Sequence, residues 1–172
     1  MTASSARSTG YRSPRRTPVQ IVAAIYGVVF LIVGVLGFIP GVTTGYETLQ
    51  FAGHHSEAML LGIFQVSILH NIVHLLYGVV GLVLARSSTS ARLYLLFGGI
   101  VYLILWVYGL VIDKDSAVNF VPLNTADDWL HLVLGVTMVA LSFLPGRKKH
   151  TGVDDTALDD PARDDPELGR RR

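Results

Sequence analysis

Four long apolar segments constrain this chain more than any other feature. They cover about residues 19–39, 58–85, 93–112 and 126–144, and the first three carry no charged side chain. The apolar core of a bilayer is ~30 Å thick, which takes about 20 helical residues to cross, and each segment supplies roughly that number. Because lipid offers no partners for backbone N–H and C=O groups, such segments are expected to be helical. The sequence therefore predicts four transmembrane helices.

The composition agrees with this prediction. Charged residues make up 16% of the chain and hydrophobic residues 51%, whereas soluble domains carry about 25% charged residues. The chain contains no cysteine, which excludes disulfides, thiolate metal sites, iron–sulfur clusters and cysteine nucleophiles.

Lysine and arginine residues predict the orientation. They flank the segments on one side of the expected membrane, and the two loops on the other side contain Lys114 alone. The positive-inside rule then places both termini in the cytoplasm. We expect an all-α, up-down, four-helix transmembrane bundle over residues 18–146 in the plasma membrane, between disordered polar tails at residues 1–17 and 147–172. The basic residues behind this assignment are Arg7, Arg12, Arg15, Arg16, Arg86, Arg92, Arg147, Lys148 and Lys149.

Strongly polar side chains inside the expected membrane segments indicate one candidate site. Such residues are costly in lipid and commonly mark function. Three histidines, His70, His74 and His131, lie within these segments. When residues are counted back from the cytoplasmic ends, the three share one layer in the outer half of the bilayer, beneath a loop rich in Asn and Asp. The polar site predicted from the sequence consists of His70, Asn71, His74, Asn119, Asn124, Asp127, Asp128 and His131.

Several chemistries suit this residue set. Metal candidates are His70, His74, His131 and Asp127, which provide imidazole and carboxylate ligands suited to zinc. A haem held between His74 and His131 is a second alternative, and a proton relay in a small transporter is a third. The fourth is structural, with imidazoles that hydrogen-bond across helices.

An enzymatic role is not expected. His70-Asn71-x-x-His74 has the histidine spacing of a zinc protease, but Asn71 occupies the position of the catalytic glutamate, and an amide is no general base. Phosphate-binding, dinucleotide-binding and nucleophile-elbow motifs are absent from the sequence. We expect a structural or interaction protein without a resident cofactor, whose partners are the lipid bilayer and a second copy or another membrane protein, and not nucleic acid.

The second and fourth segments echo one another. His74-Leu-x-x-Gly78-Val matches His131-Leu-x-x-Gly135-Val, which predicts two similar helical hairpins, with a chance match as the alternative. The polar and small residues of these segments are expected to face each other across the bundle. Thr125 with Asp128 three residues later predicts a capping box at the start of the fourth helix.

Three long stretches resemble a known family. Residues 37–44 (GFIPGVTT), 62–78 (GIFQVSILHNIVHLLYG) and 119–131 (NFVPLNTADDWLH) are similar to a bacterial family of small four-span membrane proteins catalogued only as a domain of unknown function. The resemblance covers about residues 18–145. It implies four helices and a plasma-membrane location, and it implies no activity or cofactor.

Overall fold

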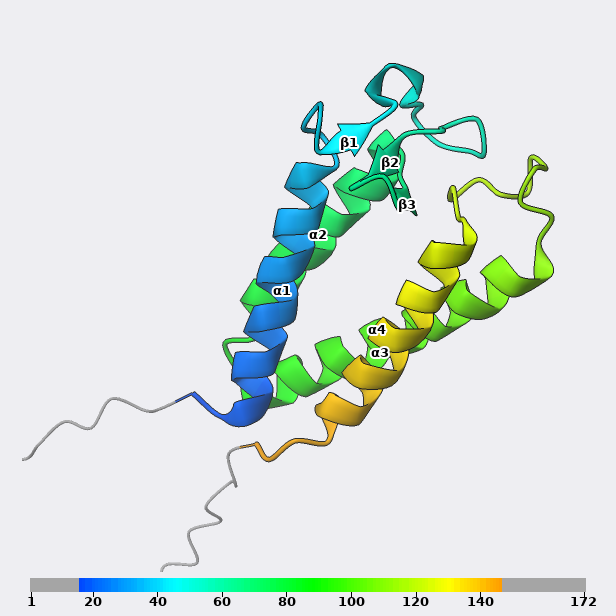
Figure 1. Ribbon diagram of the computed structural model, residues 1–172. Helices are drawn as coiled ribbons and strands as arrows, with labels where there is room; N and C mark the ends of the chain where they lie inside the picture. The colour runs from blue at the N-terminus through cyan, green and yellow to red at the C-terminus, as the bar shows by residue number, and fades with distance from the viewer. Residues whose placement is uncertain (1–15, 147–172) are drawn as a thin grey trace, which may run out of the picture.

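A computed structural model describes residues 16–146 of the chain, which are mostly helical (Figure 1). The expected disorder of residues 1–17 and 147–172 falls outside this range, apart from residues 16 and 17. The helices are α1 (Pro18–Leu36), α2 (Ile68–Leu84), α3 (Ser88–Val111) and α4 (Thr125–Ser142).

Two helices of the described chain, α1 and α3, are long and apolar enough to cross a membrane. Their mean hydropathies are 2.6 and 2.1. Helix α2 is apolar but has only 17 residues, and α4 begins with two aspartates. The helix count therefore agrees with the sequence prediction, whereas length and composition identify two membrane-capable helices.

Helix α2 begins ten residues later than the sequence predicts. Residues expected to extend it from Ala58 instead form strands β2 (Met59–Leu60) and β3 (Phe64–Gln65), which pair with β1 (Thr43–Thr44) in a three-stranded antiparallel sheet. The short 3₁₀ helix η1 (Tyr46–Thr48) follows β1.

A tight turn explains this error. Leu61 and Gly62 adopt φ angles of 54° and 70°, in a left-handed region that a helix cannot include. Ser67 then caps α2 by accepting a hydrogen bond from the backbone N–H of His70. The prediction of one helix over residues 58–85 is therefore wrong at its start, because apolar content alone does not distinguish the small sheet from a helix.

Glycines bring the helices of each hairpin into close contact. A Cβ atom on Gly27 of α1 would lie 3.0 Å from the carbonyl oxygen of Gly78 in α2. In the second hairpin, a Cβ on Gly99 of α3 would lie 2.9 Å from the carbonyl oxygen of Gly135 in α4. Small residues allow this backbone approach, which is how helices pack where lipid removes the hydrophobic driving force.

The two hairpins repeat more than their glycines. Gln20 donates from Nε2 to the carbonyl oxygen of Ala85 at 3.1 Å, and Arg92 donates from Nε to the carbonyl oxygen of Ser142 at 3.0 Å. The acceptors Ala85 and Ser142 are as far apart in the sequence as His74 and His131, so they occupy matching positions of the repeat. Leu31 packs on Gly78 as Leu103 packs on Gly135, with each Cγ 2.7 Å from the Cβ position. The repeat expected from the sequence is therefore present in the helix contacts.

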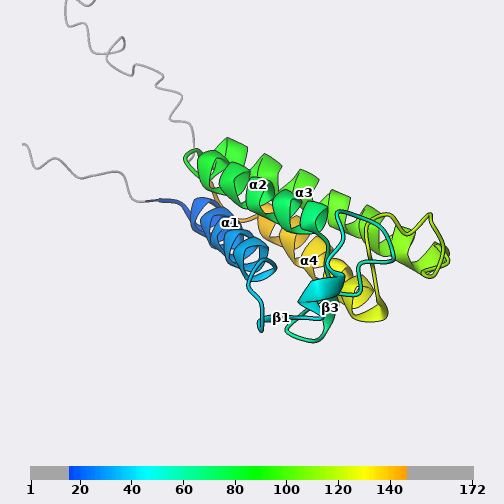
Figure 2. The ribbon, with the colours of Figure 1, turned by 90° about the horizontal axis from the view of Figure 1, so that it is seen from above.

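The helices of the two hairpins contact each other from the end that carries the termini to the level of Phe30 and Tyr102. The hydroxyls of Thr17 and Ser88 are 3.0 Å apart, those of Tyr26 and Thr137 are 2.7 Å apart, and the ring of Phe30 stacks on Tyr102. Beyond these contacts the hairpins diverge toward the sheet (Figure 1). From above, α2 lies beside α3, and α1 faces α4 (Figure 2). The helices of the two hairpins are therefore farther apart at the sheet end than near the termini (Figure 1).

We predict that Gly27→Val destabilises the protein by about 1–3 kcal/mol, because the added methyl groups would overlap the α2 backbone. Urea unfolding in mild detergent, followed by circular dichroism, measures this change. The neighbouring Val28 is exposed, so Val28→Leu serves as the control and is expected to leave the free energy of unfolding unchanged. Equal stability of Gly27→Val and the native protein would contradict the packing role of Gly27.

Candidate functional site

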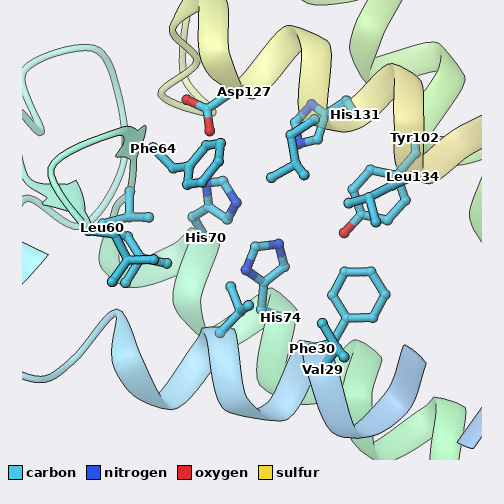
Figure 3. A pocket seen from close by; sticks show the side chains of 14 residues that line it. Val29, Phe30, Leu60, Phe64, His70, His74, Tyr102, Asp127, His131 and Leu134 are labelled. Atoms are coloured by element: carbon cyan, nitrogen blue, oxygen red, sulfur yellow. The ribbon is translucent and has the colours of Figure 1, made fainter. Parts of the chain in front are cut away.

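A cavity of about 200 Å³ lies between the hairpins, beneath the small sheet (Figure 3). Its walls are mostly aliphatic and aromatic, and its polar members are three histidines and one aspartate. The lining residues are Val29, Phe30, Val33, Leu60, Leu61, Phe64, Val66, His70, His74, Tyr102, Asp127, Leu130, His131 and Leu134.

A second cavity of about 260 Å³ is lined by the same three histidines and Tyr102. The first cavity lies between α1 and α4, whereas the second lies between α2, α3 and the loop that precedes α4. The histidines therefore separate two apolar cavities within the gap between the hairpins. The remaining residues of the second cavity are Ser67, Leu69, Val73, Leu105, Phe120 and Val121.

Helical spacing places the histidines. His70 and His74 are four residues apart and thus share a face of α2, where their ring centroids lie 4.4 Å apart. His131 projects from α4 of the other hairpin (Figure 3). Each hairpin sets one histidine against an aromatic ring: His74 lies 5.6 Å from Phe30, and His131 lies 5.2 Å from Tyr102, between ring centroids.

Among the residues that the structure describes, the three histidine rings have no hydrogen-bond partner. The Nδ1 atoms of His70, His74 and His131 are buried and unpartnered. Buried polar groups in proteins are nearly always hydrogen-bonded, so each exception requires an explanation. The hydrogen bonds across helices that a structural role predicts for these imidazoles are not formed within residues 16–146.

Asp127 ties the roof of the first cavity together. Its Oδ2 accepts hydrogen bonds from the backbone N–H groups of Asn124 and Gln65, at 3.0 and 3.1 Å. This carboxylate therefore caps α4 and anchors β3 at once, while it also lines the cavity. The capping box consists of Asn124 and Asp127, one residue earlier than the predicted pair, Thr125 and Asp128.

Asp128 has a different partner. It forms an ion pair with Lys114 at 2.6 Å, and Lys114 also donates to the carbonyl oxygen of Gly109 at 2.9 Å. Lys114 is thus held against the start of α4. The carboxylate of Asp128 is directed away from the cap because Lys114 binds it, and this contact was not predicted from the sequence.

The predicted amide-rich loop is held by its own side chains. Asn119 donates to the carbonyl oxygen of Lys114 at 2.9 Å and accepts from the backbone N–H of Leu123 at 3.1 Å. Asn124 donates to the carbonyl oxygen of Ile63 at 2.8 Å. Neither asparagine lines either of the two histidine cavities, and both hold the loop that precedes α4.

Asn71 is separated from the histidines on its own helix. Its side chain is completely buried against Gly37, at a position where any Cβ on residue 37 would overlap it. Asp128 meets Gly109 in the same way, so these two residues occupy equivalent positions in the two hairpins. Asn71 therefore packs within the first hairpin and does not line a cavity.

The expected polar and glycine faces do not oppose each other. Gly78 and Gly81 face Gly27 in α1, and Gly135 faces Gly99 in α3. Gly27, Gly78, Gly99 and Gly135 therefore pack within their own hairpins, whereas Gly81 also meets Tyr94 and Gly98 meets Tyr77 of the opposite hairpin. The prediction was wrong because helical spacing gives the residues that share a face but not the helix that this face contacts.

A metal centre gains no support from this arrangement. Within residues 16–146, no three His, Asp or Glu side chains are placed to hold one ion together. Histidines that bind metals usually donate their second ring N–H to a carbonyl or carboxylate, and the Nδ1 atoms of all three histidines lack such a partner.

Four residues of the site were missed from the sequence. Phe30 and Tyr102 appear in the sequence as ordinary apolar membrane residues, yet their rings stack 5.6 Å apart, between centroids, beside the histidines. Gln65 and Lys114 fix Asp127 and Asp128. The sequence signal for Phe30 and Tyr102 was that they occupy matching positions in the two hairpins.

A family model, described as a domain of unknown function (DUF4383), matches residues 20–144. The chain belongs to this family. The match includes every residue of both cavities, and it supports the resemblance noted from the sequence. Comparison with curated proteins and with solved structures gives no match, so the family carries no established activity to this site.

We predict that Lys114→Met destabilises the protein by about 1–3 kcal/mol, because it leaves the buried Asp128 carboxylate without its counter-ion. Thermal unfolding in detergent measures the change. Adding Asp128→Asn to this variant removes the uncompensated charge and should restore part of the loss. Asp115 in the same loop is exposed, so Asp115→Asn serves as the control. Unchanged stability in Lys114→Met would contradict the anchoring role of this ion pair.

Proposed function

We propose that this protein crosses the plasma membrane four times, with both termini in the cytoplasm. The uneven distribution of Lys and Arg supports this topology, as does the antiparallel pairing within each hairpin. Helices α2 and α4 are short for a span, at 17 and 18 residues. The loops that hydrogen bonds hold at the sheet end compensate for the short helices, because non-helical backbone at membrane depth is tolerated where protein covers it.

The proposed topology is testable because the chain has no cysteine. Single cysteines at the exposed positions Glu47 and Asp115 should react with a membrane-impermeant maleimide in intact cells. A cysteine at the exposed Thr89 should react only after permeabilisation. Labelling of Thr89→Cys in intact cells, or protection of both outer positions, would contradict the proposed topology.

Within this topology, we propose that the protein binds a small amphipathic molecule between its hairpins, on the outer side of the membrane. The observation that carries the proposal is the set of three unpartnered imidazoles bordering apolar cavities. An apolar pocket with a few convergent polar groups is the usual form of a small-molecule site. A ligand in these cavities would give the rings hydrogen-bond partners at the nitrogens that face the cavities.

The structural alternative leads to a different expectation. Histidines that stabilise the fold would hydrogen-bond across helices, and their loss would weaken the protein. Here the rings are unpaired, so the free protein bears the cost of burying polar atoms without partners. Groups that lower stability yet line a cavity are typical of functional sites.

We therefore predict that His74→Leu and His131→Leu each raise the stability of the ligand-free protein, by about 1–3 kcal/mol, because they remove unsatisfied polar atoms. Thermal unfolding in detergent gives the sign of the change. His55 lies exposed in the first outer loop, so His55→Leu is the matched control and should leave the stability unchanged. Loss of stability in both cavity variants would favour a structural role.

Ligand retention gives the second part of the test. Native mass spectrometry of the protein extracted in mild detergent should show an added mass in the native chain and in His55→Leu. The added mass should be lost in His74→Leu and His131→Leu. A native chain without any bound amphipathic molecule, together with destabilised histidine variants, would overturn the proposed function.

A further inference from the structure

The histidines also indicate which hydrogen-bonding groups a ligand needs. Burial among apolar side chains favours the uncharged imidazole, which has one N–H donor and one bare nitrogen acceptor. The Nδ1 atoms of His70, His74 and His131 are buried without partners. All three rings line the cavities, and no hydrogen bond within residues 16–146 engages their Nε2 atoms.

The cost of orphaned groups then selects a tautomer. An unpaired buried N–H is rarer in proteins than an under-satisfied acceptor, so the proton belongs on Nε2 and the bare nitrogen on Nδ1. Tautomers are assigned in this way from the hydrogen-bond network. Each of the three rings consequently presents an N–H donor to the accessible space at the cavities, and none presents a positive charge there.

The complement of this surface is a neutral molecule that accepts hydrogen bonds. A carboxylate or phosphate would bring a charge into an apolar cavity without a cation, because Lys114 is already paired with Asp128. An alcohol or a phenol carries its own O–H donor, and this donor finds no acceptor among ring nitrogens that present N–H groups to the cavity. Carbonyl oxygens accept without donating, so a carbonyl compound satisfies the three rings best.

The placement of the donors narrows the shape of the ligand. His70 and His74 belong to the first hairpin and His131 to the second, so the donors approach the gap from both sides (Figure 3). A flat ring with carbonyl oxygens on opposite edges fits this arrangement. The stacked rings of Phe30 and Tyr102 provide aromatic surface next to it, where a second π-system packs favourably.

Both cavities extend to the apolar outside of the helices. Val29 lines the first cavity and is 43% exposed, and Val73 lines the second and is 50% exposed. In the proposed topology these exposed side chains face lipid. A hydrocarbon tail attached to the ring can therefore leave between α1 and α4 or between α2 and α3, without passing through the roof formed by the sheet.

We propose that the cavities between the hairpins bind the oxidised ring of a lipid-soluble quinone, through N–H donors from His70, His74 and His131. The inference rests on the proposed binding function and names its ligand class. It concerns binding alone and requires no electron transfer by the protein, which carries no cysteine.

The test compares matched probes on the purified full-length protein in detergent. Decyl-substituted benzoquinone should bind at least tenfold more tightly than its quinol or than decanol, as measured by calorimetric titration. His131→Phe and His74→Phe each keep an aromatic ring and remove one donor, so each should weaken quinone binding about three- to tenfold. His55→Phe is the control and should bind as the native chain does. The two variants alter different hairpins. If one of them misfolds, the quinone affinity of the other still tests the inference.

Three adverse outcomes have separate meanings. Binding of quinol or decanol as tight as that of the quinone would overturn the carbonyl inference and leave the proposed function standing. Absence of binding by all three probes, together with extracted protein that carries no amphipathic molecule, would overturn both. Quinone binding that is equal in the native chain, His131→Phe and His74→Phe would place the ligand elsewhere and overturn the inference.

Discussion

Direct backbone contact within each hairpin is the interaction on which the rest of the structure depends. Gly27 on Gly78 and Gly99 on Gly135 allow helix axes to approach where any larger side chain would separate them. The remaining space is then distributed unequally. Backbones pack closely within each hairpin, whereas the two hairpins join through polar and aromatic contacts between the termini and Phe30, and through hydrogen bonds at the sheet. The histidine cavities lie between these two regions.

The loops at the sheet end cover the cavities and are fixed by hydrogen bonds of their own polar side chains, a role that the residue types alone do not indicate. Three of the polar residues selected from the sequence, Asn119, Asn124 and Asp127, bind backbone groups. Asp128 pairs with Lys114 through Oδ2, and its Oδ1 is buried without a partner among the described residues. These contacts hold the roof in one position. The histidines are different because they border space and have no partners, and this contrast separates the proposed binding groups from their supports.

The sequence was informative where a pattern corresponds to one physical requirement. Apolar length gave the four helices, and helical spacing placed His70 and His74 on one face. It failed where two structures satisfy the same pattern. The apolar run from Ala58 suits a strand pair as well as a helix, and only the left-handed turn at Leu61 and Gly62 decides between them. The partners of Asp128 and of the glycines depend on tertiary contacts, which spacing along one helix does not specify.

The position of the cavity mouths has a consequence for affinity. If Val29 and Val73 border lipid, a molecule reaches the histidines from within the bilayer, and the concentration it presents there is set by its partition out of water. Each buried methylene favours that partition by about 0.8 kcal/mol. A long-tailed ligand would thus be enriched by orders of magnitude before any contact with the protein. Weak intrinsic affinity would then suffice for occupancy. Tail length would set the concentration of each molecule at the cavities, and hydrogen bonds to the histidines would set the selectivity among these molecules.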